Sequence, residues 1–101
     1  MAKGKRKLAP VHPGEALQEI LKEAGLTANA LALGLRVPAN RITANLNGER
    51  GITADTALRL ARYFGTSAQM WMNLQATYDL DVAEDDLGRR IGKEVVPRHA
   101  A

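Results

Sequence analysis

Apolar residues recur at helical spacing in five stretches of the chain, and each stretch is bounded by residues that start or stop helices. Apolar side chains three or four residues apart lie on one face of an α-helix. The first stretch opens at Pro13, since proline suits the first helical position. Gly25 can end it in the left-handed conformation. The inner face of this predicted helix consists of Leu17, Ile20, Leu21 and Ala24.

The next three stretches are bounded in the same way by residues that start and end helices. Thr27 is a good N-cap for a helix over residues 28–35. Pro38 can occupy the first position of a third helix, which Asn47-Gly48 ends, and Thr53 can cap a fourth, which Gly65 ends. The predicted inner positions of these helices are Ala28, Leu31, Ala32, Leu35, Ile42, Leu46, Ala57, Leu60, Ala61 and Phe64.

A fifth helix is predicted from Ser67 to about Leu80, with Trp71, Leu74 and Tyr78 on its inner face. Beyond Leu80 the apolar pattern weakens, and Gly88 and Gly92 argue against one long helix. Val95-Val96 could form a short strand instead. Since no stretch alternates apolar and polar residues over a strand length, the sequence predicts an all-α core.

Composition limits what else the chain can be. Its 101 residues suit one domain, and it has no cysteine for disulfides or thiolate metal sites. No apolar run approaches the roughly 18 residues that a membrane span requires. The basic N-terminus is not followed by the apolar segment of a secretory signal. We therefore expect a cytoplasmic protein without membrane contact.

The net charge of +3 is unevenly distributed. Residues 1–12 carry four positive charges and no acid, and residues 26–66 carry five arginines against two acids. Residues 79–86 hold five acids; they form either a solvated acidic turn or a contact for a basic protein. A basic middle segment favours a polyanionic partner.

The stretch from Thr27 to Gly48 carries the functional signal. It predicts two short helices joined by a turn of about three residues, which is helix-turn-helix spacing. On the third helix, short side chains share one face and could enter the DNA major groove, where Asn can pair with adenine and Thr or Ala can contact bases. Those residues are Asn40, Thr43, Ala44 and Asn47, with Arg41 beside them. An ordinary solvated helix face is the alternative.

The segments Thr27–Ala32, Leu35–Pro38 and Ile42–Gly48 together resemble the Xre-type helix-turn-helix. A wider string resembles the HigA (VapI) antitoxin branch of that family, over residues 12–83. Its segments are His12–Glu15, Asn47–Thr53, Asp55–Ala61, Phe64–Ser67, Trp71–Gln75 and Tyr78–Leu80.

The resemblance implies an all-α, five-helix, lambda-repressor-like domain with a short C-terminal extension. The expected parts are a flexible basic arm over residues 1–11, the DNA-binding domain over 12–83, and an extension over 84–101 that offers a dimer or partner contact. HigA-type antitoxins are usually dimers that repress their own operon through a palindromic operator. They also neutralise HigB-type toxins, which are ribosome-dependent mRNA endonucleases. A stand-alone Xre-type transcriptional regulator without a toxin partner is the alternative function.

The resemblance also implies which residues meet DNA. It makes residues 38–47 the recognition helix. The residues expected to read bases there are Ala39, Asn40, Arg41, Thr43, Ala44 and Asn47. The residues expected to contact phosphates, which position the protein without reading sequence, are Thr27, Asn29, Arg36 and Arg50.

Three positions depart from the family pattern. Ala28 stands where a DNA-contacting Gln is common, and Arg36 stands where the turn usually has Gly. Asn45 occupies a position that is usually apolar. If Asn45 replaces a core residue without hydrogen-bond partners, Asn45→Ile should raise the melting temperature.

Other residues favour structural roles. His12 and His99 are isolated, so no metal site is expected, and His12-Pro13 is better interpreted as a helix start. Trp71, flanked by Met70 and Met72, is expected in the core. No catalytic constellation or phosphate-binding loop is present, so we expect neither an enzyme nor a cofactor.

A homodimer is expected because one recognition helix reads too few base pairs for useful specificity. Related domains place two recognition helices about 34 Å apart on one DNA face. The contact is predicted at the fifth helix and the segment after it, where apolar residues exceed what one helix needs for its core. Alternatively, this surface receives the toxin and the free protein is a monomer.

Overall fold

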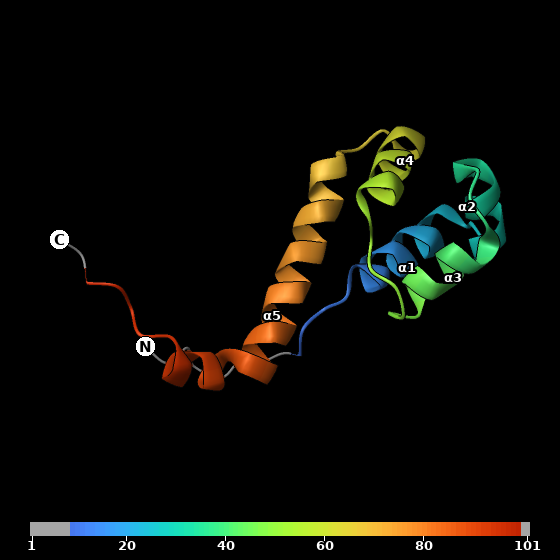
Figure 1. Cartoon of the computed structure of the whole chain (residues 1–101). Helices are drawn as coiled ribbons and strands as arrows, with labels where there is room; N and C mark the ends of the chain where they lie inside the picture. The colour runs from blue at the N-terminus through green and yellow to red at the C-terminus, as the bar shows by residue number, and fades with distance from the viewer. Residues whose placement is uncertain (1–8, 100–101) are drawn as a thin grey trace.

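The computed structural model describes residues 9–99, which form five α-helices and no strand. They are α1 (Pro13–Ala24), α2 (Ala28–Leu35), α3 (Ala39–Leu46), α4 (Ala54–Phe64) and α5 (Ala68–Glu94), shown in Figure 1. The predicted all-α, five-helix fold is confirmed. Residues 1–8 of the predicted basic arm lie outside the described residues.

Most helix ends are fixed by the residues that the sequence marked. The hydroxyls of Thr27, Thr53 and Ser67 each accept a hydrogen bond from the backbone N–H three residues on, at 3.0, 3.3 and 3.2 Å. Gly25 and Gly65 end their helices with φ of 67° and 72°. These caps satisfy backbone groups that a helix end otherwise leaves unpaired.

The start of α3 differs from the expectation by one residue. Pro38 is the N-cap and not the first helical residue, because its ψ of 144° is extended. Since proline has no N–H to be left unpaired, this position is also tolerated.

The core lies between α1, α2, α3 and α4, and the first turns of α5 close it by packing against α4 and α1. Trp71 is completely buried, as expected, whereas Met70 is 38% exposed. The buried apolar residues are Leu17, Leu21, Leu31, Ala32, Leu35, Ile42, Ile52, Ala57, Leu60 and Trp71. Each fully buried large aliphatic side chain contributes about 1.5–3 kcal/mol, so this cluster fixes how the helices pack.

α5 departs from the sequence expectation in two ways. Leu74 is 37% exposed, and Gln75, at 9%, takes the inward position one residue later. The helix also continues past Gly88 and Gly92 to Glu94, so the expected break is wrong. Each glycine costs about 1 kcal/mol, but good helix formers and the Arg90–Glu94 ion pair of 3.6 Å flank them. Val95 and Val96 follow without regular structure and form no strand.

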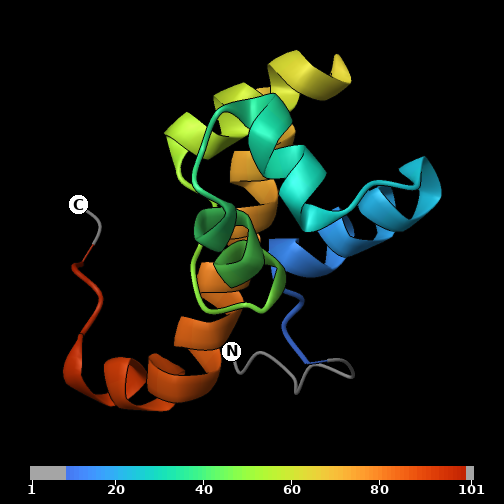
Figure 2. The same ribbon diagram turned by 90° about the vertical axis from the view of Figure 1, so that its right-hand side faces the viewer.

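The helix pair α2–α3 and the end of α5 lie on different sides of the molecule. α2 and α3 lie in front of α5 when viewed as in Figure 2. α5 bends in its second half, and its end projects sideways from the helical body in both ribbon views. The part of the chain that the structure describes contains no helix that is both long and apolar enough to span a membrane.

Candidate nucleic-acid interface

The turn between α2 and α3 is tight because Arg36 adopts the left-handed conformation. Its φ is 63° and its ψ is 45°, and it is the non-glycine residue with positive φ within residues 9–99. A non-glycine residue in this region costs roughly 1–2 kcal/mol. The N–H of Val37 bonds the Ala32 carbonyl at 3.0 Å and offsets part of that cost. The unusual Arg is therefore tolerated, and the short turn is kept.

α3 has one buried side and one exposed polar side. Ile42 and Asn45 are completely buried, and Leu46 is half-buried against the core. Ala44 is half-buried, and the remaining members of the predicted reading face are exposed: Ala39, Asn40, Thr43 and Asn47. The Thr43 hydroxyl donates to the Ala39 carbonyl at 3.2 Å, so its oxygen is left to accept. This arrangement presents short side chains that fit a major groove.

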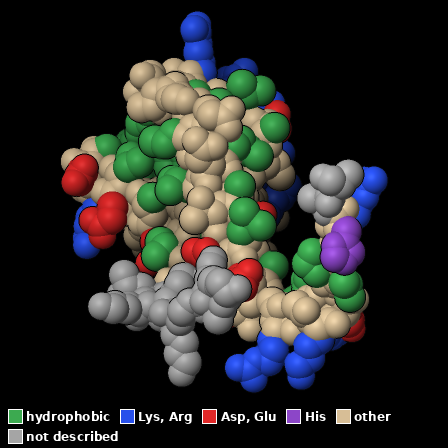
Figure 3. All heavy atoms as spheres, turned by 90° about the vertical axis from the view of Figure 1, so that its left-hand side faces the viewer, with side chains coloured by type: hydrophobic (Ala, Val, Ile, Leu, Met, Phe, Trp, Pro, Cys, Tyr) green, Lys and Arg blue, Asp and Glu red, His purple; other side chains and the backbone are tan. Residues whose placement is uncertain are grey.

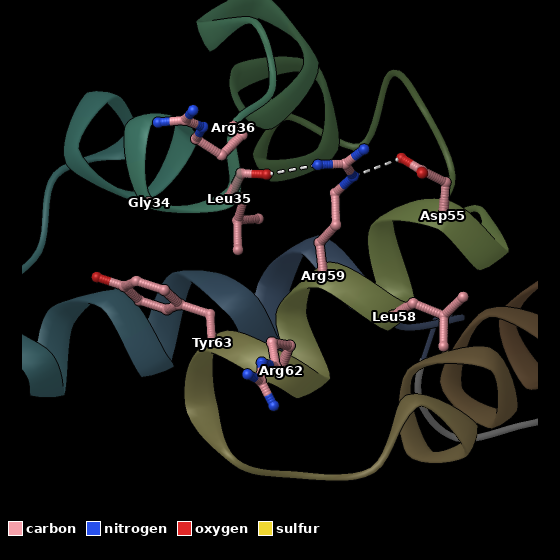
Figure 4. Close-up of a pocket in the computed structure, with 8 residues that line it drawn as sticks. All are labelled: Gly34, Leu35, Arg36, Asp55, Leu58, Arg59, Arg62 and Tyr63. Atoms are coloured by element: carbon pink, nitrogen blue, oxygen red, sulfur yellow. Dashed lines mark hydrogen bonds and ion pairs between the residues drawn. The ribbon is translucent and has the colours of Figure 1, made fainter.

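Arg41 lies apart from that face, in an ion pair with Asp55. Its Nη1 lies 2.6 Å from the Asp55 carboxylate, and Arg59 Nε contacts the same oxygen at 3.0 Å. Arg59 also donates to the Leu35 carbonyl at 2.8 Å, and Figure 4 shows this contact together with that of Arg59 to Asp55. With Arg41, these contacts join α2, α3 and α4. The hydrogen bond from Arg41, followed by that from Arg59, lowers the pKa of Asp55 below its ordinary 3.8.

The predicted role of Arg41 in reading DNA thus stays a prediction, and the observed geometry gives this residue a supporting contact. Asp55 and Arg59 also line an open groove of about 390 Å³ between α2 and α4. Figure 4 shows Arg36 and Arg62 at its two edges and Tyr63 reaching toward Gly34. Asp55 was missed as a partner of Arg41, because the sequence pattern does not show which side chains of two different helices meet.

The four predicted phosphate-contact residues are all exposed: Thr27, Asn29, Arg36 and Arg50. The Thr27 hydroxyl already accepts from Ala30 N–H, so it has a capping role as well. These residues come from the start of α2, the α2–α3 turn and the loop after α3. All three segments adjoin α3 in Figure 2.

The loop between α3 and α4 is held by two buried amide side chains. Asn45 Nδ2 donates to the carbonyls of Arg50 and Gly51, at 3.0 and 3.1 Å. On the other side, the Ile52 N–H donates to Gln75 Oε1 at 2.6 Å. Both amides were missed as loop contacts, since a propensity pattern does not show which backbone groups a buried amide will meet.

The amide nitrogen of Asn45 therefore has hydrogen-bond partners, so this residue does not simply replace an apolar one. Its Oδ1 is buried without a hydrogen-bond partner. The backbone of Asn45 is equally enclosed. A Cβ added at Gly14 of α1 would lie 2.0 Å from the Asn45 carbonyl oxygen, which explains the glycine after Pro13. Residues 9–99 contain no cluster of His, Asp and Glu able to hold a metal ion.

Comparisons with known proteins agree with this geometry. A helix-turn-helix family model matches residues 17–71. Virulence-associated protein I of Dichelobacter nodosus is 55% identical over 84 residues, covering 82% of this chain and 78% of that protein. Two solved structures are also similar. One is an addiction module antidote protein of the HigA family from Coxiella burnetii (51% identity, 90% and 100% coverage, TM-score 0.85). The other is Pseudomonas aeruginosa antitoxin HigA with the higBA promoter (46%, 89% and 99%, TM-score 0.87).

The Asn45 contacts reverse the stability effect expected from sequence alone. Asn45→Ile would leave the Arg50 and Gly51 carbonyls without their buried donor, at a cost of about 1–3 kcal/mol. Thermal unfolding should show a lower melting temperature. Asn40→Ile, at an exposed position of the same helix, controls for helix propensity and should change it far less. A higher melting temperature for Asn45→Ile would mean that the two hydrogen bonds contribute nothing net.

Proposed function

The chain belongs to the helix-turn-helix family, in the branch of the VapI and HigA antitoxins, and from this we propose that it represses transcription by binding operator DNA through α3. One observation carries the proposal: the exposed face of α3 holds short polar side chains, while α2 packs across its buried face through a tight left-handed turn. The similar Pseudomonas aeruginosa HigA was solved with the higBA promoter, which supports the same use of this fold here.

The proposed DNA contacts fall into two classes, which are contacts to bases and contacts to phosphates. Asn40 and Asn47 can form paired hydrogen bonds with adenine, and Thr43 and Ala44 can meet base edges beside them. Thr27, Asn29, Arg36 and Arg50 can bind phosphates and so fix the orientation of α3 without reading sequence. Arg41 contributes by holding α3 against α4 through Asp55, or by direct contact with DNA once that pair opens.

The family consists of antitoxins and regulators, so the expectation that the chain is not an enzyme is confirmed. DNA and a ribosome-dependent toxin are both encountered in the bacterial cytoplasm, where we place the protein. The proposed division into a basic arm (1–11), a DNA-binding domain (12–83) and a C-terminal extension (84–101) follows from these roles. α5 crosses the last of these boundaries without interruption.

A dimer is the second part of the proposal, with a second copy of the chain as the occupant of the end of α5. Leu87, Ile91 and Val95 are 37%, 46% and 61% exposed and recur at helical spacing on the part that projects from the body. Figure 3 looks onto α5 and shows hydrophobic side chains along both of its flanks. A lateral contact here leaves α3 free and can set the spacing between two recognition helices.

Neutralisation of a HigB-type toxin is the third part. The resemblance to HigA antitoxins supports it, whereas a stand-alone regulator would have the same DNA-binding surface and no toxin. The genes that neighbour this one distinguish the two functions, and so does a direct test of whether the chain binds the neighbouring gene product.

Operator binding should respond differently to substitutions in the two classes of contact. Asn40→Ala should cost roughly 1–3 kcal/mol on the operator and little on unrelated DNA, because it removes a base contact. Arg50→Ala should weaken all sequences alike and reduce the salt dependence by about one charge. Fluorescence anisotropy with operator and scrambled duplexes at several salt concentrations measures both effects. Equal operator affinity for wild type and the Asn40→Ala, Arg41→Ala double variant would refute the assignment to α3.

The dimer should dissociate when a charge is placed on the apolar stripe of α5. Ile91→Asp should convert a dimer into a monomer at micromolar concentration, because it buries an unpaired carboxylate in the contact. Arg89→Asp lies on the opposite side of the helix and is the control. Light scattering measures the mass, also for a chain truncated after Asp79. A monomeric wild-type chain would eliminate the dimer, and a dimer that survives truncation would place the contact elsewhere.

Toxin neutralisation is tested by co-expression with the small basic protein encoded next to this chain. We expect the chain to restore growth and to co-purify with that protein. Asn40→Ala should rescue growth as well as wild type does, since it affects only DNA reading. Failure of wild type to rescue growth or to co-purify, while operator binding persists, would favour the stand-alone regulator.

A further inference from the structure

Gln75 is a buried polar residue for which neither packing nor the DNA contacts account. It lies on α5, on the side facing the core, and is 9% exposed. Its Oε1 accepts the Ile52 N–H at 2.6 Å, and its Nε2 donates to Asp79 Oδ1 at 2.9 Å, one turn along the same helix. The Asp79 contact orients the amide, so the oxygen and not the nitrogen faces the loop.

The loop is shaped to meet this amide. A Cβ added at Gly51 would lie 3.1 Å from the amide carbon, oxygen and nitrogen of Gln75, so a larger residue there would push the amide by a few tenths of an ångström. Ile52 is 2% exposed and anchors the loop in the core, and Thr53 then caps α4. On its other side, the same backbone receives the two hydrogen bonds from Asn45 of the recognition helix.

Arg50 is the residue that this arrangement positions. Its carbonyl is bound by Asn45, and its side chain is exposed two residues before the Gln75 contact. The Arg50 N–H also donates to the Ala44 carbonyl of α3 at 3.2 Å, so the Arg50 backbone is tied to α3 directly. Without the Gln75 contact the loop would be held from α3 alone, and the segment after Arg50 could shift and redirect the Arg50 side chain. Two anchors, one on α3 and one on α5, hold it in register.

We propose that Gln75 is a positioning residue for DNA binding: it holds the loop that carries Arg50, and it thereby links the phosphate contact to α5. This rests on the proposed operator binding. The hydrogen bonds Asn45–Arg50, Ile52–Gln75 and Gln75–Asp79 thus join the DNA surface to α5, and the proposed dimer contact lies further along the same helix. Operator affinity then depends on a side chain that touches no DNA.

The first test examines the loop without DNA. Gln75→Met keeps the size of the side chain and removes both hydrogen bonds. We expect the Ile52 amide to exchange with deuterium at least about tenfold faster, as measured by NMR, because its buried acceptor is lost. Amides within α1 and α2 should keep their rates. Unchanged exchange at Ile52 would overturn the inference whatever the DNA result.

The second test asks whether Gln75 acts through Arg50. Gln75→Met should weaken operator binding about five- to tenfold and reduce the salt dependence as Arg50→Ala does. In the Arg50→Ala background, the same change should have less than about a twofold further effect, because residues that act as one unit are not additive. Full additivity, as a general loss of stability would give, would overturn the inference. Failure of wild type to bind operator would instead refute the proposed function.

Two variants control for folding. Gln69→Met removes a hydrogen bond of 2.9 Å to Asn73 on the exposed surface of the same helix and should leave both readouts unchanged. The double variant Gln75→Glu, Asp79→Asn retains an acceptor for Ile52 N–H and reverses the donor between the two positions. It should recover most of the operator affinity that Gln75→Glu alone loses by facing Asp79. Absence of that recovery would contradict the role assigned to the amide.

Discussion

The buried amides of Asn45 and Gln75 set the geometry on which the rest of the interface depends. Ordinary apolar packing assembles the five helices around one core that includes Trp71, but it does not determine how a loop of irregular backbone lies between two of them. Buried backbone groups must be paired, and here side chains of α3 and α5 pair them. The same contacts fix the approach of the loop to the recognition helix, so a requirement of folding also becomes a requirement of DNA binding.

Beside this loop, a cluster of ion pairs reinforces the packing of the helices. Asp55 holds Arg41 and Arg59, and Arg59 reaches the last carbonyl of α2. An exposed pair of this kind is worth little alone, and its value lies in geometry. It keeps α3 aligned with α2 and α4, while Asn40, Thr43 and Asn47 stay exposed. The strained turn at Arg36 fits the same account, because a short connection leaves α3 little freedom to rotate.

Much of this was predictable from sequence, because local signals agreed with the global fold. Thr27, Thr53, Ser67, Gly25 and Gly65 marked the helix ends that the structure has, and the exposed face of α3 followed from helical spacing. The errors arose where tertiary contacts override local preference. Gly88 and Gly92 are weak helix formers but do not stop α5, and Gln75 replaces Leu74 on its inner side. Asn45 binds irregular backbone of the following loop, and Arg41 binds a side chain of a second helix. Helical periodicity does not show such partners.

In the proposed mode of binding, α3 and the loop that follows it form one DNA-binding unit, which α5 holds in place. An NMR titration of the labelled protein with its operator duplex tests this most directly. Amide shifts should be largest along α3, at the start of α2, and in the loop from Asn47 to Ile52, with a smaller change at Gln75. Shifts confined to α1, to the exposed flank of α4 or to the end of α5 would place the DNA elsewhere and contradict the account.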